Sequence, residues 1–496
     1  MRASPPSQLL RPDQDPRPEV KLPTVRVAGT CLLLAMLAAA LIFGALTLTS
    51  RLGSTNSFVL IVGGAVVVAL CCLPKDWLPS AALAIFLVVP RVALSENDFL
   101  NTITPSFIIL VVWYARSIFA PRPEFAAVKS RVGVAYKLIA GALLAWLAAS
   151  VFTNGLLQTS LAWCLDLAVL GLLIVLVPVP ANAIANLQRT FLWAAVLMAA
   201  YCSVEFLVQR NFLFDPIYAA LNIVPAQHWS VYRASGSLGH PLYAGLFFSM
   251  AFGVAFGKRL EGGSNKYLLV AGISMLGVLT TVSRNSLGAV AIAAGVIILP
   301  NLFRRSSLSP PAKIALAAAV VGGVFGITQA SAFQDRLDSD EAQGSTNARG
   351  VIVDLAFQVA QASHWIGSGP GSSVSAAAPL NPRGVIIESA YLQLLISVGI
   401  PGLLLFALLI AGGVLTAIKY NAYAGLGCLA AYAVSVGFFN VLESSRPTIL
   451  LLGFALLMAW RDRPIEIGEN DPMKPPVGAL SMRTAPTNNA VGARSR

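Results

Sequence analysis

The sequence predicts an all-α polytopic membrane protein with 12–14 transmembrane helices and a large external loop that carries an amphipathic helix. The chain has 496 residues, of which 56% are hydrophobic and only 11% are charged. A soluble domain carries about a quarter charged residues, so this chain has too few charges to cover a water-facing surface. The same composition argues against a disordered protein, a secreted disulfide scaffold and a nucleic-acid-binding domain, despite the net charge of +12.

Apolar runs long enough to cross a bilayer recur along the chain, because a hydrocarbon core about 30 Å thick needs roughly 20 apolar residues per helix. Residues 1–26 are predicted to be a disordered cytoplasmic leader, 27–460 a transmembrane domain with its external loops, and 461–496 a disordered cytoplasmic tail. The candidate spans are 27–49, 57–73, 77–94, 104–119, 134–153, 160–178, 190–209, 238–257, 266–283, 285–302, 312–330, 389–417, 422–440 and 447–460.

Lysine and arginine counts predict the orientation, since cytoplasmic loops keep an excess of both. With both termini inside the cell, most of the 34 basic residues and every lysine fall on the cytoplasmic face. The guanidinium group binds phosphate in a bidentate fashion, so an outer face that carries only arginines suggests a phosphate or carboxylate partner. These outer residues are Arg51, Arg91, Arg210, Arg233, Arg284, Arg336, Arg349, Arg383 and Arg446.

Two long loops, 210–237 and 331–388, are predicted outside. Loops of this length usually carry function, although a simple tether between helices is the alternative. The second loop contains apolar residues at helical spacing, which predicts an amphipathic helix over about 347–363 on the outer membrane surface. Glycines at 367, 369 and 371 then flank Pro370 and predict a tight turn whose backbone approaches a partner closely.

The sequence offers no metal or cofactor site. All six cysteines lie within apolar runs, and no C-x-x-C pair has an accompanying histidine. We therefore expect neither a metal nor another cofactor.

Five motifs occur in order along the chain: YRASGSLGHPLYAG at 232–245, SRNSLGA at 283–289, RGVIVDLA at 349–356, HWIGSGPG at 364–371 and ESAYLQLLISVGIPGLLLF at 388–406. Together they resemble the O-antigen ligase and polymerase superfamily of bacterial envelope glycosyltransferases, over roughly residues 190–420. The resemblance implies a lipid-dependent, GT-C-like fold in the bacterial inner membrane. It also implies an undecaprenyl-diphosphate-linked glycan donor on the periplasmic side, without a nucleotide sugar or a required metal.

The resemblance assigns a diphosphate-binding role to three arginines, Arg233, Arg284 and Arg349. Positive charge is needed there because the diphosphate leaves as the glycosidic bond breaks. The alternative is that these arginines pair with Asp354, with Glu388 or with lipid headgroups.

The acceptor hydroxyl needs a general base. Ligases of the family are expected to have a histidine where this chain has Glu388, so Glu388 is our first candidate and His364 the second; Glu388 could equally be an ion-pair partner only. His240 precedes Pro241 at a helix start and is expected to support the site, as are Gly369 and Gly371. Asp166 and Glu205 lie in or near spans, where ionisable groups are often functional.

Because Glu388 stands where ligases of the family are expected to have a histidine, the sequence favours a polymerase. Such an enzyme moves a growing glycan onto a fresh lipid-linked acceptor. Expected partners are the lipid-linked donor, a glycan or lipid-linked acceptor, membrane lipid and a chain-length regulator, but not nucleic acid. The first alternative is a ligase that transfers the finished glycan to its final acceptor. A lipid-linked oligosaccharide flippase and a non-catalytic scaffold are the others.

Overall fold

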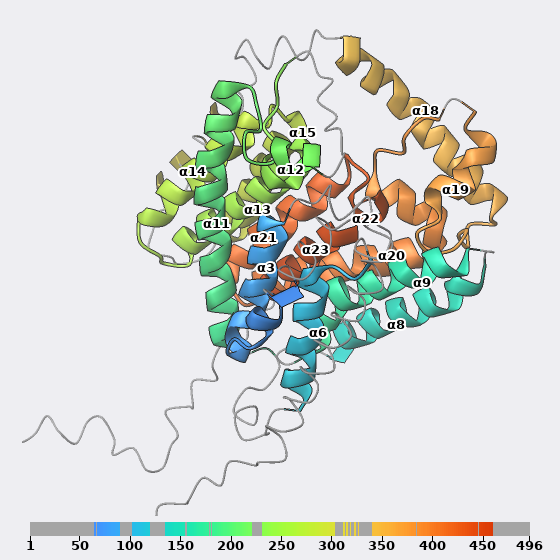
Figure 1. The fold of residues 1–496 in the computed structure, drawn as a ribbon, viewed down its shortest axis with the longest axis horizontal. Helices are drawn as coiled ribbons and strands as arrows, with labels where there is room; N and C mark the ends of the chain where they lie inside the picture. The colour runs from blue at the N-terminus through green and yellow to red at the C-terminus, as the bar shows by residue number, and fades with distance from the viewer. Residues whose placement is uncertain are drawn as a thin grey trace, which may run out of the picture. The chain divides into compact units, whose positions relative to one another are not determined.

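The residues that the structure describes form helices and loops without a β-strand (Figure 1). This computed structural model describes most residues between 64 and 459, and its longest gaps are 90–101, 120–133, 221–230, 303–310 and 327–339. The helices are α3 (Leu78–Val88), α6 (Pro105–Ile118), α8 (Val134–Ser150), α9 (Leu157–Asp166), α10 (Leu173–Leu176), α11 (Ala181–Val208), α12 (Asp215–Ala220), α13 (Pro241–Leu260), α14 (Lys266–Thr280), α15 (Arg284–Leu302), α18 (Asp340–Ala362), α19 (Ser373–Ala377), α20 (Ala390–Lys419), α21 (Tyr423–Val436), α22 (Val441–Ser444) and α23 (Ile449–Ala459).

The predicted fold class is confirmed: this is an all-α polytopic membrane protein. Among the described residues, four stretches are long and apolar enough to cross a membrane, namely Leu157–Leu176, Asn182–Val208, Arg284–Asn301 and Ala390–Lys419. Several shorter apolar helices coincide with other candidate spans. The predicted leader, the tail and span 27–49 lie outside the described residues, as do large parts of spans 57–73 and 312–330.

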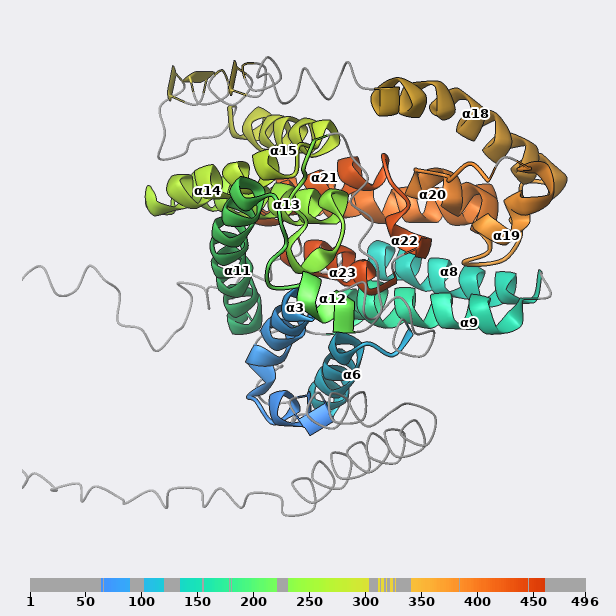
Figure 2. The ribbon, with the colours of Figure 1, turned by 45° about the horizontal axis from the view of Figure 1, so that its top comes forward.

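Helix α13 lies at the centre of the helical packing, where α11, α14, α15 and α21 contact it (Figure 2). It is apolar around most of its circumference, and a helix of that kind is stable only when it is covered on all sides. Phe247 and Phe248 are fully buried there, and Phe252 stacks on Phe256 with ring centroids 5.5 Å apart.

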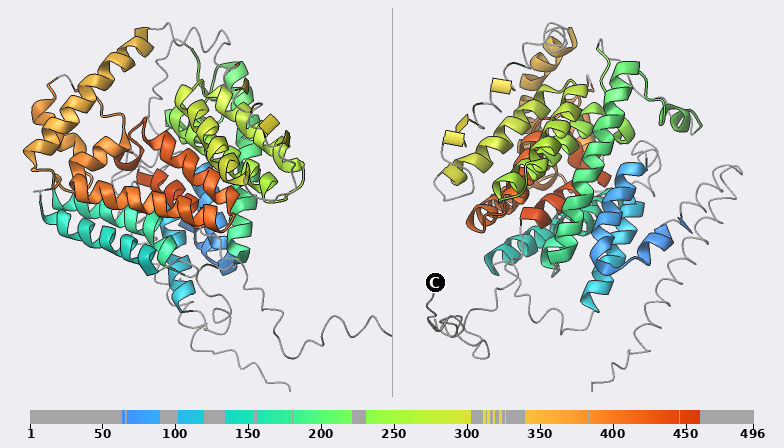
Figure 3. Two further views of the ribbon diagram at one scale, coloured as in Figure 1. Left: turned by 180° about the vertical axis from the view of Figure 1, so that it is seen from behind. Right: turned by 90° about the vertical axis from the view of Figure 1, so that its left-hand side faces the viewer.

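Helix α20 carries a kink at Gly399, where φ is 68° and ψ is −173°, and Pro401 follows inside the helix. Proline and non-helical glycine geometry both break the backbone hydrogen-bond ladder. Helix α8 packs along α20 (Figure 3). The Trp146 indole N–H of α8 donates to the carbonyl of Val398, the residue before the kink, at 2.8 Å.

The amphipathic helix predicted over 347–363 is α18, but its apolar face does not lie where we expected. Ile352, Leu355 and Val359 are buried against Ile387 and Ile396 of the same chain, rather than on a membrane surface. Apolar residues at helical spacing show that one face is covered, but not what covers it. The covering surface comes from the loop before α20 and from α20 itself.

Candidate functional site

The Arg233 side chain lies beside the end of α14. Only 6% of the residue is exposed, and its Nε donates a hydrogen bond to the Thr281 carbonyl at 2.9 Å. The next residue, Ala234, donates its backbone N–H to the Thr280 carbonyl at 2.9 Å. Two hydrogen bonds therefore hold Arg233 and Ala234 against the end of α14. The bond from Ala234 fixes the backbone beside the arginine, and the bond from Nε orients its guanidinium.

Glu205 of α11 holds the same segment from the other side. Its carboxylate accepts the backbone N–H groups of Ser235 and Gly236 at 3.0 and 2.9 Å and the Tyr232 hydroxyl at 3.2 Å. Glu205 is fully buried, and a buried carboxylate needs such donors to offset its lost hydration. Glu205 thus acts as a structural clamp on the arginine-bearing segment.

Arg210 is close to Glu205 in the chain, and that spacing alone would make the two candidates for an ion pair. The structure places Arg210 beside Asp215 instead, with Nε and Oδ2 3.9 Å apart. The partners of Glu205 come from a segment about thirty residues later, a contact that local sequence does not indicate.

Arg284 begins α15, directly after a strained turn. Val282 has φ 45°, which is rare for a β-branched residue and is typical of functional sites. The Ser283 hydroxyl then caps α15 by accepting the N–H of Ser286 at 3.3 Å. Helix α13 approaches so closely that a Cβ on Gly245 would lie 2.1 Å from the Ser286 hydroxyl oxygen. The turn that leads into Arg284 also supplies the carbonyl that Arg233 binds.

Arg349 and Glu388 complete the group. The Arg349 guanidinium lies 5.9 Å from the centroid of the Phe438 ring, a cation–π contact. Glu388 is exposed, but neighbouring protein atoms displace part of its hydration, which raises the pKa of its carboxyl. The charge of Arg349 and, after it, that of Arg233 lower the same pKa. Both arginines therefore lie within electrostatic reach of Glu388.

Aromatic side chains connect this group to the start of α13. His240 caps that helix, since its Nδ1 accepts the Leu242 N–H at 3.2 Å. Its ring contacts Tyr243, whose ring in turn contacts Phe439 at a centroid distance of 5.3 Å. The Phe439 carbonyl accepts the N–H of Ala390, two residues after Glu388. His240 thus positions backbone and aromatic rings near the carboxylate.

The glycine-rich turn docks on the kink of α20. A Cβ on Gly367 would lie 2.6 Å from the backbone nitrogen of Gly399, and the Ser368 N–H donates to the Ile396 carbonyl at 2.8 Å. Gly369 and Gly371 follow with φ of 101° and 70°. The partner that the turn approaches is therefore another motif of the same chain.

His364 lies at the opposite end of α18 from Arg349. It follows the last turn of the helix with φ 52° and is exposed. At a rise of 1.5 Å per residue, the helix between them spans about 20 Å. The structure thus brings Arg233, Arg349 and Glu388 together with the turn of Arg284, and it places His364, Gly369 and Gly371 elsewhere.

Sequence reasoning missed a second charged group, centred on Glu443 of α22. Its carboxylate accepts the Ser373 N–H at 3.1 Å and the hydroxyls of Ser373 and Ser397. Burial raises the pKa of Glu443 to about 7, against the lowering effect of these hydrogen bonds and of Arg446. The short polar ESSR run at 443–446, between the last two candidate spans, was the available signal.

Arg446 also acts electrostatically on Asp166, which is fully buried at the end of α9. Both Asp166 carboxylate oxygens lack a hydrogen-bond partner among the described residues. A π-helical turn, Leu167–Leu172, follows directly. Asp166 was a suspect from its place in a span, and the structure adds Arg446 as its electrostatic partner.

In the part of the chain that the structure describes, no three His, Cys, Asp or Glu side chains are grouped so that they could hold a metal ion.

Residues 269–407 match the family model described as O-antigen ligase. Among curated proteins, no sequence matches the chain. The matched region runs from α14 into α20 and includes Arg284, Arg349, His364 and Glu388, whereas Arg233, His240 and Glu443 lie outside it.

Proposed function

We propose that this chain, whose residues 269–407 match the O-antigen ligase family model, is a polymerase that transfers a glycan from undecaprenyl diphosphate to an acceptor glycan. The site would face the periplasm from the bacterial inner membrane. The observation that carries this proposal is that the charges of Arg349 and Arg233 both act on the Glu388 carboxyl.

The arginines suit the departing diphosphate. As the bond between the anomeric carbon and the diphosphate oxygen breaks, negative charge builds up on that oxygen. Preplaced cations stabilise such charge without reorganising during the reaction. Arg233 is fixed by Thr281 and Arg349 is placed over Phe438, while Arg284 begins the helix after the shared turn. Together they would hold the diphosphate before and after the bond breaks.

Glu388 suits the acceptor side. It would take the proton from the attacking hydroxyl while the hydroxyl oxygen forms the new bond to the anomeric carbon. A base works best when its pKa approaches the working pH, and the pKa of Glu388 is shifted in that direction. The charges of the two arginines oppose that shift and favour the ionised carboxylate, which is the form that a base requires.

A ligase is the second candidate, because the matched family model carries that description. It uses the same donor and the same leaving group but a different final acceptor. The polymerase is preferred because the position where ligases of the family are expected to have a histidine is Glu388 here.

The test is a transfer assay with purified protein in lipid bilayers and an isolated lipid-linked oligosaccharide. Arg233→Ala, Arg284→Ala and Arg349→Ala should each lower the transfer rate by about 100-fold or more, the usual effect of removing one such donor. Arg210→Ala is the matched control, since that side chain is 69% exposed and faces Asp215. Full turnover in all three variants would overturn the diphosphate-binding role of the arginines.

The products distinguish the candidates. Lengthened glycan on the lipid carrier indicates a polymerase, and glycan on a different final acceptor indicates a ligase. Movement of labelled lipid-linked oligosaccharide across proteoliposomes, without a new glycosidic bond, would indicate a flippase instead.

A further inference from the structure

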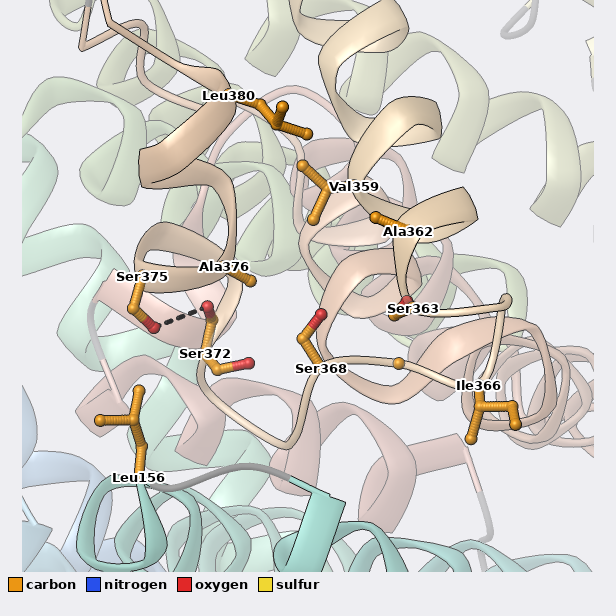
Figure 4. Close-up of a pocket in the computed structure, with 11 residues that line it drawn as sticks. Leu156, Val359, Ala362, Ser363, Ile366, Ser368, Ser372, Ser375, Ala376 and Leu380 are labelled. Atoms are coloured by element: carbon orange, nitrogen blue, oxygen red, sulfur yellow. Dashed lines mark hydrogen bonds between the residues drawn. The ribbon is translucent and has the colours of Figure 1, made fainter.

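A groove of about 680 Å³ lies beside the glycine-rich turn (Figure 4). The end of α18, the turn itself, α19 and the residue before α9 form its walls. It is lined by Leu156, Val359, Ala362, Ser363, Ile366, Gly367, Ser368, Ser372, Ser375, Ala376 and Leu380.

The lining contains serines and apolar residues but no charged side chain. Three of the hydroxyls already donate to backbone carbonyls: Ser363 to Ala360 at 3.0 Å, Ser372 to Gly369 at 2.6 Å and Ser375 to the carbonyl of Ser372 at 2.9 Å. A hydroxyl has one hydrogen and two lone pairs, so these oxygens retain acceptor capacity. A matching ligand would donate hydrogen bonds and carry no charge.

Apolar side chains lie between and around the serines. Figure 4 shows Val359 and Ala362 on one wall and Leu156 below the serines. A sugar ring combines hydroxyl donors at its edge with apolar C–H faces, and it therefore suits a surface that alternates hydroxyl oxygens with aliphatic groups. A diphosphate would find no cation in the lining, and a purely apolar chain would leave the hydroxyl acceptors without partners.

The groove and the arginine site share α18. Val359 and Ser363 are ten and fourteen residues after Arg349, so they lie about 15–20 Å along the axis. A glycan that is held at its diphosphate end near Arg349 and extends over that length along the exposed side of α18, which carries Val353 and Phe357, reaches the groove with sugars farther along its chain.

We propose that this groove binds a neutral stretch of the glycan at a distance from the diphosphate. This inference rests on the proposed glycan-transfer function and adds to it a subsite for glycan chains longer than the reacting unit. If the groove binds glycan in this way, the protein should prefer long glycans over short ones. That preference should not depend on the residues that act on the diphosphate.

The first test is binding. The probe is an oligosaccharide of several repeats, released by mild acid from lipid-linked glycan of the host cell, so that it carries neither lipid nor phosphate. Ser375→Trp and Ala362→Trp fill the groove, and both positions are exposed, so that the larger side chain needs no repacking of a core. Val374→Trp and Gln361→Trp are matched controls, because these neighbours are exposed but do not line the groove.

The wild type and both controls should bind the oligosaccharide, and the filling variants should lose affinity by about tenfold or more, a free-energy difference of ~1.4 kcal/mol. Ser363→Ala and Ser375→Ala keep the shape of the groove and remove acceptors, so they should weaken binding less than tryptophan does. Equal affinity in filling and control variants, or no binding to the wild type, would overturn the proposal. Binding of sugar-free undecaprenyl phosphate in place of the oligosaccharide, lost on filling, would assign the groove to lipid and overturn it as well.

The second test compares donors of one repeat and of several repeats. The filling variants should transfer the single-repeat donor at the rate of the controls and the long donor more slowly. Equal slowing of both donors would show that the groove is not a separate subsite. Failure of the proposed function appears differently, because the wild type would then transfer neither donor, whatever its affinity for the released oligosaccharide.

Discussion

Gly367 and Gly399 lie backbone against backbone, although the first belongs to the glycine-rich turn and the second to the kink of α20. A Cβ on Gly399 would lie 2.3 Å from the Ile366 carbonyl carbon, and one on Gly367 would lie 2.6 Å from the Gly399 nitrogen. Two motifs that are separate in the sequence therefore form one packed unit. Because Glu443 binds Ser397 just before the kink and Ser373 just after the turn, it fastens the same unit.

Replacing Gly399 by alanine should destabilise the protein. The residue has φ 68° and ψ −173°, a conformation that is essentially restricted to glycine and costs other residues about 1–3 kcal/mol, and the added methyl would collide with backbone. We expect Gly399→Ala to lower the unfolding temperature in detergent by several degrees. Gly350→Ala is the control, since that glycine is within α18 with open space around it and alanine there should stabilise by about 0.5–1 kcal/mol. Similar unfolding temperatures for Gly399→Ala and the wild type would contradict the packed unit.

The glycine spacing predicted a turn and a close approach, but not its partner. Local patterns show that backbone comes near something, and the identity of that neighbour depends on contacts between distant parts of the chain. The same limit explains α18: its apolar spacing predicted a helix over about the right residues, yet its buried face packs on protein rather than on a membrane surface.

Glu205 should control activity through Arg233. Glu205→Ala leaves the N–H groups of Ser235 and Gly236 without their acceptor, at a cost of about 1–3 kcal/mol each, and it releases the segment that carries the arginine. A displacement of about 1 Å at a reacting centre lowers rates by about 100-fold, so we expect a loss of that order in the transfer assay. Glu205→Gln should lose less, because its amide oxygen still accepts one of the two bonds.

Glu261 provides the matched control for Glu205. Its carboxylate also accepts a backbone N–H, that of Ala424 at 2.9 Å, and it pairs with Lys258 at the far end of α13. Glu261→Gln should lower stability while the transfer rate per folded molecule stays near that of the wild type. An equal loss of transfer rate in Glu205→Gln and Glu261→Gln would mean that Glu205 affects the rate only through the stability of the whole protein.

Stability should depend on pH through Glu443. Its pKa is raised to about 7 in the folded protein, so between the ordinary value of 4.5 and about 7 the folded state binds more protons than the unfolded state. The free energy of unfolding therefore falls as pH rises through this window, by roughly 3 kcal/mol in total. Unfolding temperatures measured from pH 5 to pH 8 should decline in the wild type, and the decline should be smaller in Glu443→Gln. An equal decline in both proteins would exclude Glu443 as its source.

Most of the proposed site was accessible from sequence because its residues belong to recognisable motifs. Arg233, Arg284, Arg349 and Glu388 each stand in a motif that resembles the superfamily, and the structure brings Arg233 and Arg349 within electrostatic reach of Glu388. Glu443 belongs to no such motif. Its carboxylate contacts Ser373 and Ser397, which lie far from it in the chain. Sequence spacing does not predict such contacts.

Glu388 and His364 were the two candidates for the base, and the structure separates them. Glu388 lies with Arg233 and Arg349, whereas His364 lies about 20 Å from Arg349 along α18. Glu388→Gln removes the proton acceptor while keeping the shape of the side chain, and it should lower the transfer rate by about 100-fold or more, as loss of a general base does. His364→Gln should keep a rate close to that of the wild type. The reverse result, a slow His364 variant beside a fast Glu388 variant, would move the base to the far end of α18 and leave Glu388 as an ion-pair partner of the arginines.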